Sequence, residues 1–234
     1  MKDAFFTLAD RLTRETHADE SLLLWLSGER SDFVRFNQGR VRQPGSVAQQ
    51  ILTVRLVRNR RQAAATVTIA GTIGDEALAR ATVGRLRDTL GDLAEDPWLA
   101  IAEHPESTTH ARRGRVPPAE EVVEQVVATS AGRDLVGIYA GGSMMRGFAN
   151  SLGQRNWHEI DCFNLDWSLH LRADKAVKCS YAGFDWDAEA FEAKQADARR
   201  TIARIEATPR TIEPGDYRAY VAPAALDELV GLLG

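Results

Sequence analysis

A histidine and a glutamate stand side by side in NWHEIDCF, residues 156–163, and this pair opens the motif of many zinc hydrolases. In that motif a second histidine follows one helical turn later, so both rings bind one zinc ion while the glutamate acts as general base. Here the position four residues after His158 is Cys162, and the next histidine is His170. The stretch therefore lacks the ligand spacing of a helical zinc site.

The residues around this pair predict a strand. From Ile160 to Leu171 apolar and polar residues alternate with a period close to two, which is typical of a half-buried β-strand. In a strand, His158 and Cys162 share one face and Glu159 lies on the other. We interpret the stretch as structural, with an independent hydrolase built on these three side chains as the remaining alternative.

Other groups of reactive residues also have a structural interpretation. The serine in GGSMMRG, residues 141–147, lies outside a Gly-x-Ser-x-Gly elbow, and no Lys-Ser/Thr of a phosphate-binding loop follows. The pattern favours a tight connection between two strands. His104 and His110 lie in a proline-rich segment without a nearby acidic or cysteine partner, so we expect them to be solvated. Cys162 and Cys179 are expected to be buried free thiols.

The clusters of charged residues also have a structural interpretation. Two arginine groups could meet phosphates, but no aromatic residues are interleaved with them, so solvent-exposed positions are expected. They comprise Arg55, Arg58, Arg60, Arg61, Arg112, Arg113 and Arg115. The aspartates that invite a carboxylate-pair interpretation have no fixed spacing. They are Asp161, Asp166, Asp174, Asp185 and Asp187, of which the last suits a helix N-terminus. We predict no catalytic residue and no metal ligand in this chain.

The composition is that of a soluble globular protein. The 234 residues are 44% hydrophobic and 26% charged, with a net charge of −4. This balance gives no general attraction to nucleic acid or anionic membranes. The sequence holds no run of about eighteen apolar residues and no apolar signal core near its start. We expect a cytoplasmic protein that binds neither nucleic acid nor membrane.

Periodicity predicts helices and strands in two groups. Helices are expected over residues 4–12, 74–93, from 118 onward, 187–207 and 223–234. Strands are expected over 22–29, 31–41, 47–59, 62–69, 134–142, 144–151, 154–171, 175–185 and 216–222, with turns at 151–153 and 172–174. The predicted fold class is α+β, with two helix-covered antiparallel-sheet units joined by a proline-rich linker. The units are residues 1–96 and 119–234, and the linker is 97–118.

Several motifs, in this order, resemble the TldD/PmbA family of zinc metallopeptidases and their partners. FVRFNQGRV (33–41) resembles the family's first hairpin, and FANSLGQ (148–154) its Asn-Ser-x-Gly turn. GDYRAYVAPAALDELV (215–230) resembles its Gly-x-Tyr-x-Val-x-x-Pro-x-Ala segment. The matching positions, expected to be structural, are Asn37, Gly39, Asn150, Ser151, Gly153, Gly215, Tyr217 and Pro223.

The resemblance implies a function for the chain as part of a larger system. In the family, TldD-type subunits carry a His-Glu-x-x-x-His zinc helix, and PmbA-type (TldE) subunits lack it and pair with them around a channel for unfolded polypeptide. Here the fifth residue after His158 is Phe163, and the family's zinc helix lies beyond the matching segment.

The expected function is therefore an N-terminal scaffold of the peptide channel that is not catalytic by itself. It would pair with a TldD-type subunit or with itself as a dimer, and bind unfolded polypeptide or peptide. No cofactor is expected in this chain, and zinc is expected only in a missing C-terminal domain or partner. The alternative is a stand-alone peptide-binding or interaction module that uses exposed strand edges.

Overall fold

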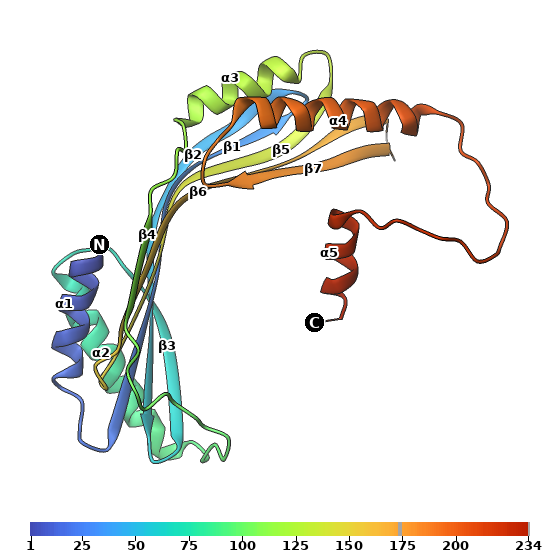
Figure 1. Cartoon of the computed structure of the whole chain (residues 1–234). Coiled ribbons are helices and arrows are strands. Elements are labelled where there is room, and N and C mark those ends of the chain that lie inside the picture. Colours follow the sequence, from blue (N-terminus) through green and yellow to red (C-terminus); the bar gives the residue numbers. More distant parts are fainter. Residues whose placement is uncertain (173–174, 234) are drawn as a thin grey trace.

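A computed structural model describes residues 1–172 and 175–233, in which helices cover a sheet of long strands (Figure 1). The elements are, in chain order, α1 (Lys2–Thr13), β1 (Glu20–Asn37), β2 (Arg40–Arg58), β3 (Arg61–Ile69), α2 (Gly74–Thr89), η1 (Leu90–Asp92), β4 (Thr108–Arg112), α3 (Ala119–Thr129), β5 (Asp134–Asn150), β6 (Arg155–Arg172), β7 (Lys175–Gly183), α4 (Ala188–Glu206) and α5 (Pro223–Gly231). No helix in these described ranges is long and apolar enough to cross a membrane.

The described strands form one sheet of seven strands in the order β3-β2-β1-β5-β6-β4. The seventh strand, β7, also pairs with β6, along residues 163–172, whereas β4 pairs with residues 156–160 of β6. Neighbouring strands are antiparallel, except that β4 runs parallel to β6. The α+β class with helix-covered antiparallel strands is confirmed. The two groups of helices share this single sheet instead of covering one sheet each. The division at 1–96, 97–118 and 119–234 stays a prediction.

Two strands run through positions where the sequence suggested breaks. β1 is continuous from Glu20 to Asn37 and β5 from Asp134 to Asn150, so the separate strands predicted at 22–29 and 31–41, and at 134–142 and 144–151, are wrong. The turn after β1 lies at Gln38 and Gly39, whose φ angles are 53° and 68°. Such a two-residue turn with both φ angles positive joins antiparallel strands tightly.

The glycines of GGSMMRG explain the second error. The tight connection between two strands that was predicted there is wrong, because the stretch lies inside β5. Its glycines instead permit a close approach of β5 to β1. A Cβ atom on Gly142 would lie 2.2 Å from the carbonyl oxygen of Arg30 on β1. Glycine inside a strand can mark such a close approach as well as a turn.

The segment between α4 and α5 differs from the prediction. Residues 216–222 have no strand, so that prediction is wrong, and Tyr217 and Tyr220 are 60% and 88% exposed. Alternating apolar residues favour a strand, but a strand also needs a partner for its backbone hydrogen bonds. The other turn, predicted at 172–174, lies outside the described residues at positions 173 and 174.

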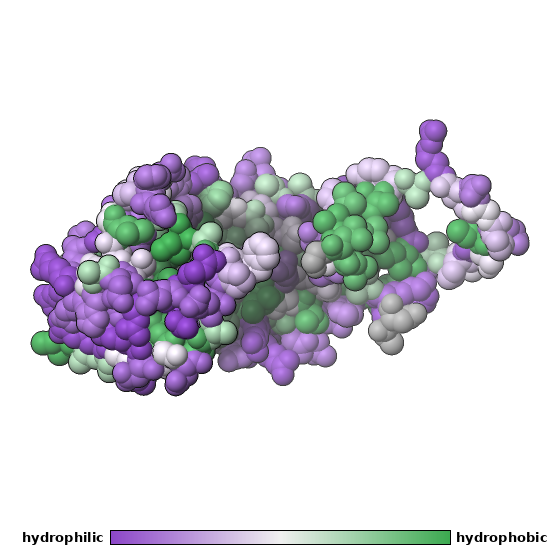
Figure 2. All heavy atoms as spheres, turned by 90° about the horizontal axis from the view of Figure 1, so that it is seen from below, coloured by the Kyte–Doolittle hydropathy of each residue, from purple (hydrophilic) through white to green (hydrophobic). Residues whose placement is uncertain are grey.

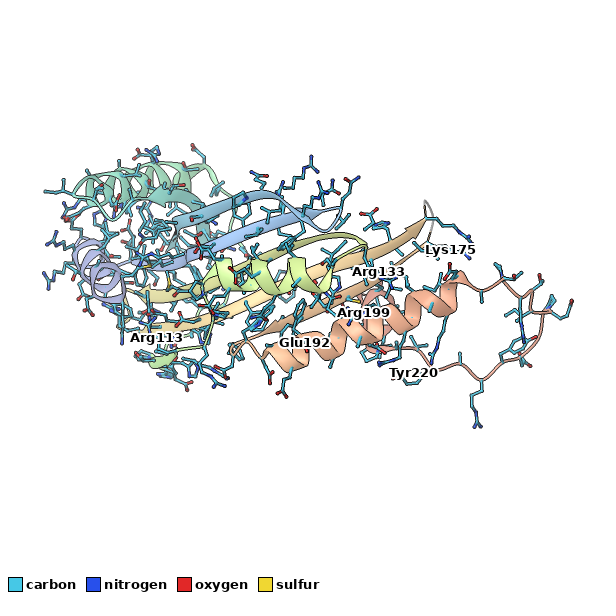
Figure 3. The ribbon with its side chains drawn as sticks, turned by 90° about the horizontal axis from the view of Figure 1, so that it is seen from above. Arg113, Arg133, Lys175, Glu192, Arg199 and Tyr220 are labelled. Atoms are coloured by element: carbon cyan, nitrogen blue, oxygen red, sulfur yellow. The ribbon has the colours of Figure 1, made fainter. Side chains whose placement is uncertain are left out.

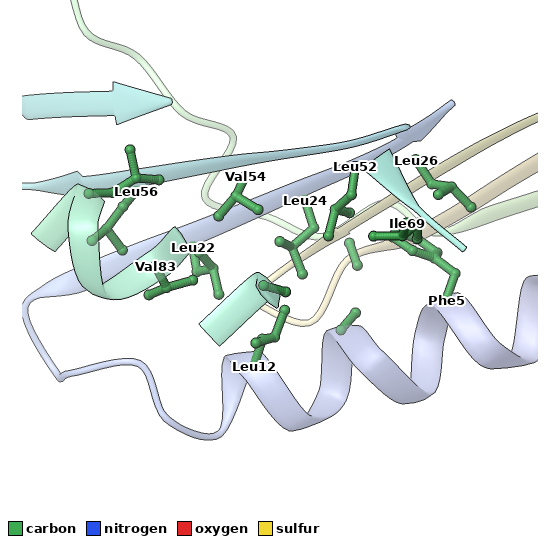
Figure 4. Close-up of a cluster of buried hydrophobic side chains, with 14 of the residues drawn as sticks. Phe5, Leu12, Leu22, Leu24, Leu26, Leu52, Val54, Leu56, Ile69 and Val83 are labelled. Atoms are coloured by element: carbon green, nitrogen blue, oxygen red, sulfur yellow. The ribbon is translucent and has the colours of Figure 1, made fainter. Parts of the chain in front are cut away.

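The helices α1 to α4 cover the same face of the sheet. Leu22, Leu24 and Leu26 of β1 pack against α1 and α2 in one buried cluster (Figure 4). Further along β1, Val34 and Phe36 belong to a second cluster beneath α3 and α4. These β1 residues are all even-numbered, so their side chains share one face of the strand. The two cores therefore lie side by side on one continuous sheet.

The spacing of apolar residues in each helix fits this arrangement. Phe5, Ala9 and Leu12 of α1 are buried at intervals of one helical turn, within the helix expected over residues 4–12. Helix α4 begins after Asp187, whose carboxylate accepts hydrogen bonds from two backbone N–H groups, at 2.9 and 3.2 Å. Helices α3 and α4 lie side by side above the sheet (Figure 3), where Arg199 donates to the Thr129 carbonyl at 3.3 Å.

Candidate functional site

The face of the sheet opposite helices α1 to α4 is largely bare. Figure 1 shows the sheet bent between its two ends, with these helices outside the bend and α5 inside it. We call the inner surface the concave face. It comprises the odd-numbered residues from Leu23 to Arg35 of β1 and the residues registered with them on β2, β3, β5, β6 and β7. Seen from below, this face is recessed between the β1–β3 end of the molecule and α5 (Figure 2).

The stretch NWHEIDCF lies within β6, and its interpretation as a strand is confirmed. Trp157 and Phe163 are buried on the helix-covered face, at 2% and 3% exposure. His158 lies on the opposite, concave face, where it is registered with Arg146 of β5. Glu159 accepts from the Trp157 indole at 3.2 Å and pairs with Arg113, also at 3.2 Å. His158 and Glu159 thus point to opposite sides of the sheet.

The histidines do not assemble a metal site among residues 1–172 and 175–233. His110 of β4 stacks on His158, with ring centroids 5.1 Å apart and an interplanar angle of 15°. No cluster of three or more His, Cys, Asp or Glu side chains suited to a metal ion occurs in those ranges. A protein zinc site needs three or four ligands, so the described residues do not fit a zinc ion. His104 lies exposed before β4.

The two cysteines are free, as predicted, but each is half-buried. Cys179 of β7 is registered with Trp167 and packs against the second core. Cys162 lies on the concave side, registered with Gly142. The two thiols therefore point to opposite faces of the sheet. Burial raises the pKa of each thiol, which disfavours the reactive thiolate.

Most of the predicted arginine clusters are occupied by protein partners. Arg60 and Arg61 at the tip of the β2–β3 hairpin donate to backbone carbonyls that precede the linker, those of Asp96 at 3.3 Å and Leu93 at 2.7 Å. Arg112 stacks over the Phe184 ring, with its Cζ atom 4.0 Å from the centroid, and lies 3.4 Å from the Asp185 carboxylate. These arginines are paired with protein groups, although Arg60 and Arg112 are exposed, as the sequence predicted.

The candidate aspartates also have separate structural partners. Asp161 accepts from the Ser143 hydroxyl at 2.5 Å, and Asp166 from the Asn164 amide at 2.8 Å. Asp185 accepts from the Arg115 backbone N–H at 2.9 Å, and this hydrogen bond lowers the pKa of its carboxyl. Asp187 caps α4 as predicted. Asp174 lies outside the described residues.

The positions that carry the family resemblance lie at turns, in the tail and at a helix start. The Asn150 side chain accepts from the N–H groups of Leu152 and Gln154, at 3.1 and 2.9 Å, and Ser151 donates its N–H to Leu22 at 2.9 Å. Gly153 has a φ of 95°, which suits glycine. The remaining positions are Asn37 and Gly39 at the β1–β2 turn, Gly215 and Tyr217 in the segment between α4 and α5, and Pro223 at the first position of α5. A functional role for them stays a prediction.

Sequence reasoning missed the apolar residues of the concave face. Trp25 is 41% exposed on β1, and its ring lies 4.8 Å from that of Phe148 on β5. With Thr53 and Arg55 it borders a shallow hollow of about 450 Å³. Trp25 stands in the apolar run LLLWL, in which the alternation between faces is hidden. Only the strand register separates it from its buried neighbours.

A second hollow lies on the concave face towards α5. It has a volume of about 400 Å³, and its lining includes the basic residues Arg35, Arg42 and Lys178. Val136 and Ile138 also line it, and they are 38% and 39% exposed. A surface that combines exposed apolar side chains with basic groups can hold a ligand with both kinds of chemistry.

Two chain segments bound the concave face. Ile101 and Ala102 of the linker line a small cavity of about 40 Å³ together with Leu23 and Phe148, which closes one end of the face. At the other end α5 approaches β7, where Glu228 lies 3.6 Å from Lys178. Between these two segments the strands present their side chains to solvent. The face is thus an open trough whose two ends are set by the chain itself.

This fold is shared with TldE and with proteins described as putative modulators of DNA gyrase. The structure of TldE from Thermococcus kodakarensis superposes with a TM-score of 0.63 at 13% identity, over 86% of this chain and 47% of that chain. A putative modulator of DNA gyrase from Bacteroides thetaiotaomicron gives 0.60 at 13% identity, over 87% of this chain and 49% of that chain. One from Thermotoga maritima gives 0.56 at 11% identity, over 83% and 47%.

The chain thus spans about half the length of the solved structures that it matches. No family model and no curated protein matches it. The fold expected from the TldD/PmbA resemblance is confirmed by these structures. At 11–13% identity they show a common fold and leave activity and partners to be argued from the site.

Proposed function

We propose that the chain is a peptide-binding scaffold of a TldD/PmbA-type peptidase system and forms part of the wall of its peptide channel. The bare concave face is the observation that carries this proposal. An antiparallel sheet normally leaves a face to solvent when that face is polar. Here the uncovered face presents Trp25, Val136 and Ile138, each about two-fifths exposed. Exposed apolar side chains in a recess mark a binding surface.

An extended polypeptide suits the shape of this face. β1 is 18 residues long and is bent together with its neighbours, so the trough continues along both arms of the sheet. Each strand residue rises about 3.3 Å, which gives a surface long enough for an extended segment of many residues. The apolar groups bind side chains, while hydroxyl and amide groups such as Ser27, Thr53 and Asn164 offer hydrogen bonds.

In this proposal the chain is not catalytic by itself. This part of the proposal is supported by His110 and His158, which have no third His, Cys, Asp or Glu grouped with them among residues 1–172 and 175–233. Zinc chemistry would come from a further domain or from a TldD-type partner, and a second copy of this chain is the other candidate partner. A cytoplasmic location belongs to the same proposal.

The test is site-specific crosslinking to an unfolded protein. Photoreactive p-benzoylphenylalanine is placed at Thr53 on the concave face, and in a control variant at Glu192, which is exposed on α4. Fluorescent unfolded casein should crosslink at Thr53 and not at Glu192. A further variant carries the photoreactive residue at Trp25. Equal crosslinking at Thr53 and Glu192, or no crosslinking at either Thr53 or Trp25, would overturn the binding role. Stoichiometric zinc with metal-dependent cleavage by this chain alone would contradict its non-catalytic character.

Strand addition at a sheet edge is the second candidate function. β3 ends the strand order and pairs only with β2 in the described residues. An exposed edge of this kind can take a peptide as an additional strand through backbone hydrogen bonds. A peptide with alternate amides N-methylated distinguishes the two modes. It loses edge binding because its donors are blocked, but keeps its side-chain contacts with the concave face.

A further inference from the structure

We infer that the concave face selects acidic polypeptide segments in which carboxylates are interspersed with apolar residues. This inference rests on the proposed function, because it specifies the substrate class of the same face. It comes from the sign of the charge on the concave face, which is opposite to the sign of the net charge of the whole chain. The chain as a whole carries a net charge of −4.

Basic side chains outnumber carboxylates on the concave face and in the hollow that it contains. The basic residues are Arg35, Arg42, Arg55, Arg146 and Lys178. The carboxylates are Glu29 and Asp166. Because the whole chain is acidic, the remaining surface carries the excess of negative charge. A recess with the opposite sign to the rest of the molecule concentrates ligands of complementary charge.

The carboxylates of this face are engaged with neutral neighbours. Glu29 accepts from the Ser31 hydroxyl at 2.6 Å and from the Gln49 amide at 2.9 Å. Asp166 accepts from the Asn164 amide at 2.8 Å. Among the described residues, neither Arg35 nor Arg42 has a carboxylate within 4.0 Å, although both are exposed. Their charges are therefore available to a ligand.

The 400 Å³ hollow combines these charges with apolar contacts. Arg35, Arg42 and Lys178 line it together with Val136 and Ile138, which are about two-fifths exposed. Arginine guanidinium groups bind carboxylates through two parallel hydrogen bonds, and the two β-branched side chains offer apolar surface beside them. A segment with a Glu or Asp next to Leu or Val matches both parts of the hollow.

Helix α5 of the chain itself has this chemistry and already contacts the face. Its sequence PAALDELVG contains Asp227 and Glu228 and no basic residue. Leu226, Leu229 and Val230 are 50%, 51% and 57% exposed, and Figure 2 shows an apolar patch in the region of α5. Glu228 lies 3.6 Å from Lys178, although both side chains are nearly four-fifths exposed. An acidic, apolar segment thus lies at the edge of the hollow, beside a basic residue that lines it.

A polypeptide fits this surface better than a nucleic acid does. Nucleic acids carry a regular series of phosphates, which would meet Glu29 and Asp166 as well as the arginines. The aromatic residues that line the hollow, Phe36 and Trp167, are each only 2% exposed, so they offer no ring there on which a base could stack. An acidic peptide can place its carboxylates beside the arginines and its aliphatic side chains on Val136 and Ile138.

The test measures binding of the full chain to three fluorescein-labelled peptides of equal length by anisotropy. Valine and leucine alternate with glutamate in the first, glutamine in the second and lysine in the third. The glutamate peptide should bind about tenfold more tightly than the glutamine peptide at low salt, since a few exposed charge pairs contribute roughly this much. The lysine peptide should bind most weakly. The differences should shrink as ionic strength rises.

Charge-reversal variants locate the effect. Arg35→Glu and Arg42→Glu should each abolish or reverse the preference for glutamate over glutamine. Arg200→Glu is the matched control, because Arg200 is exposed on α4 on the helix-covered side, where its nearest carboxylate is Asp197 at 3.0 Å. The control should keep the preference. Circular dichroism and melting curves establish that all three variants fold, as expected for substitutions at exposed positions.

The outcomes separate this inference from the proposed function. Equal binding of the glutamate and glutamine peptides, unchanged by Arg35→Glu, would refute the acidic selectivity while the peptide-binding role stands. Failure of all three peptides to bind would remove the peptide-binding role as well. A single-stranded oligonucleotide that binds more tightly than the glutamate peptide, and is lost in Arg35→Glu, would refute the inference in favour of a nucleic-acid surface.

Discussion

The two faces of the sheet are made by the same strands, yet they differ in almost every physical property. Leu24 and Trp25 are neighbours on β1, and their side chains are 0% and 41% exposed. The helix-covered face holds two buried cores, one mainly aliphatic and one rich in aromatic rings. The concave face has exposed apolar side chains mixed with hydroxyls, amides and basic groups. Stability therefore resides mainly on one face, and the binding role that we propose belongs to the other.

The largest expected effect separates the neighbours Leu24 and Trp25. Leu24→Ala should lower the free energy of unfolding by about 4 kcal/mol, because it leaves a cavity in a fully buried cluster. Trp25→Ala should lower it by about 1 kcal/mol, because the side chain is 41% exposed and its loss leaves no closed cavity. Urea denaturation of both variants measures the two values.

Binding should show the opposite ranking for this pair. Trp25→Ala should weaken the affinity for unfolded casein, while Leu24→Ala should leave it unchanged at a temperature where the variant is fully folded. If both substitutions cost the same stability, the assignment of the two side chains to different faces is wrong.

The second prediction compares two glutamates of β1. The Glu20 side chain is fully buried under α2, where its carboxylate accepts from the Arg87 Nε and Nη2 atoms at 2.7 and 2.8 Å. Glu29 lies on the concave face. Glu20→Gln should destabilise the protein by about 3 kcal/mol, since it leaves Arg87 without its counter-charge. Glu29→Gln should cost less than about 1 kcal/mol.

The dependence on pH has a definite sign. The hydrogen bond from Arg87 holds the pKa of Glu20 below its ordinary value in the folded protein, against the opposing effect of burial. Its contribution is therefore fully present above the unfolded pKa, near 4.5, and is lost as pH falls through the lower folded value. The stability gap between the parent and Glu20→Gln should be constant from pH 7 to about pH 5 and then narrow. A gap that widens on acidification would contradict this assignment.

The sequence predicted the helix-covered face far better than the concave one. The periodicity that predicted α1 arises from burial at positions such as Phe5 and Leu12, so it records where the helix meets the sheet. The concave face has no such signal. Its residues are defined by register between strands distant in sequence, for example Trp25 beside Phe148. The hollow with Arg35 and Lys178 depends on pairings of the same kind, which no local pattern encodes.

The third prediction concerns Gly142, where β1 and β5 approach between the two cores. Gly142→Ala would place its Cβ 2.2 Å from the Arg30 carbonyl oxygen, so the backbone must shift. We expect a loss of about 2 kcal/mol, in the range of local backbone strain. Gly183→Ala is the control, because its Cβ would lie 3.5 Å from Phe163, an ordinary contact. Equal melting temperatures of the two variants would show that the sheet does not need glycine at position 142.

The smallest effect distinguishes two tyrosines of the helix-covered face. The Tyr139 hydroxyl is buried and has no hydrogen-bond partner among the described residues. Burial raises the pKa of this phenol to about 12. The Tyr181 hydroxyl, in contrast, accepts from the Asp187 backbone N–H at 3.0 Å. A buried polar group without a partner opposes folding, whereas a paired one contributes about 1 kcal/mol.

Tyr139→Phe should therefore keep or raise the free energy of unfolding, by up to about 1 kcal/mol, while Tyr181→Phe should lower it by a similar amount. Both substitutions keep the ring and its packing in the second core, so the difference isolates the hydroxyl. Chemical denaturation of the two variants under identical conditions measures it. A loss of more than about 1 kcal/mol in Tyr139→Phe would mean that a buried water binds this hydroxyl. The core beneath α3 and α4 would then be partly hydrated, and only the mainly aliphatic core beneath α1 and α2 would exclude water.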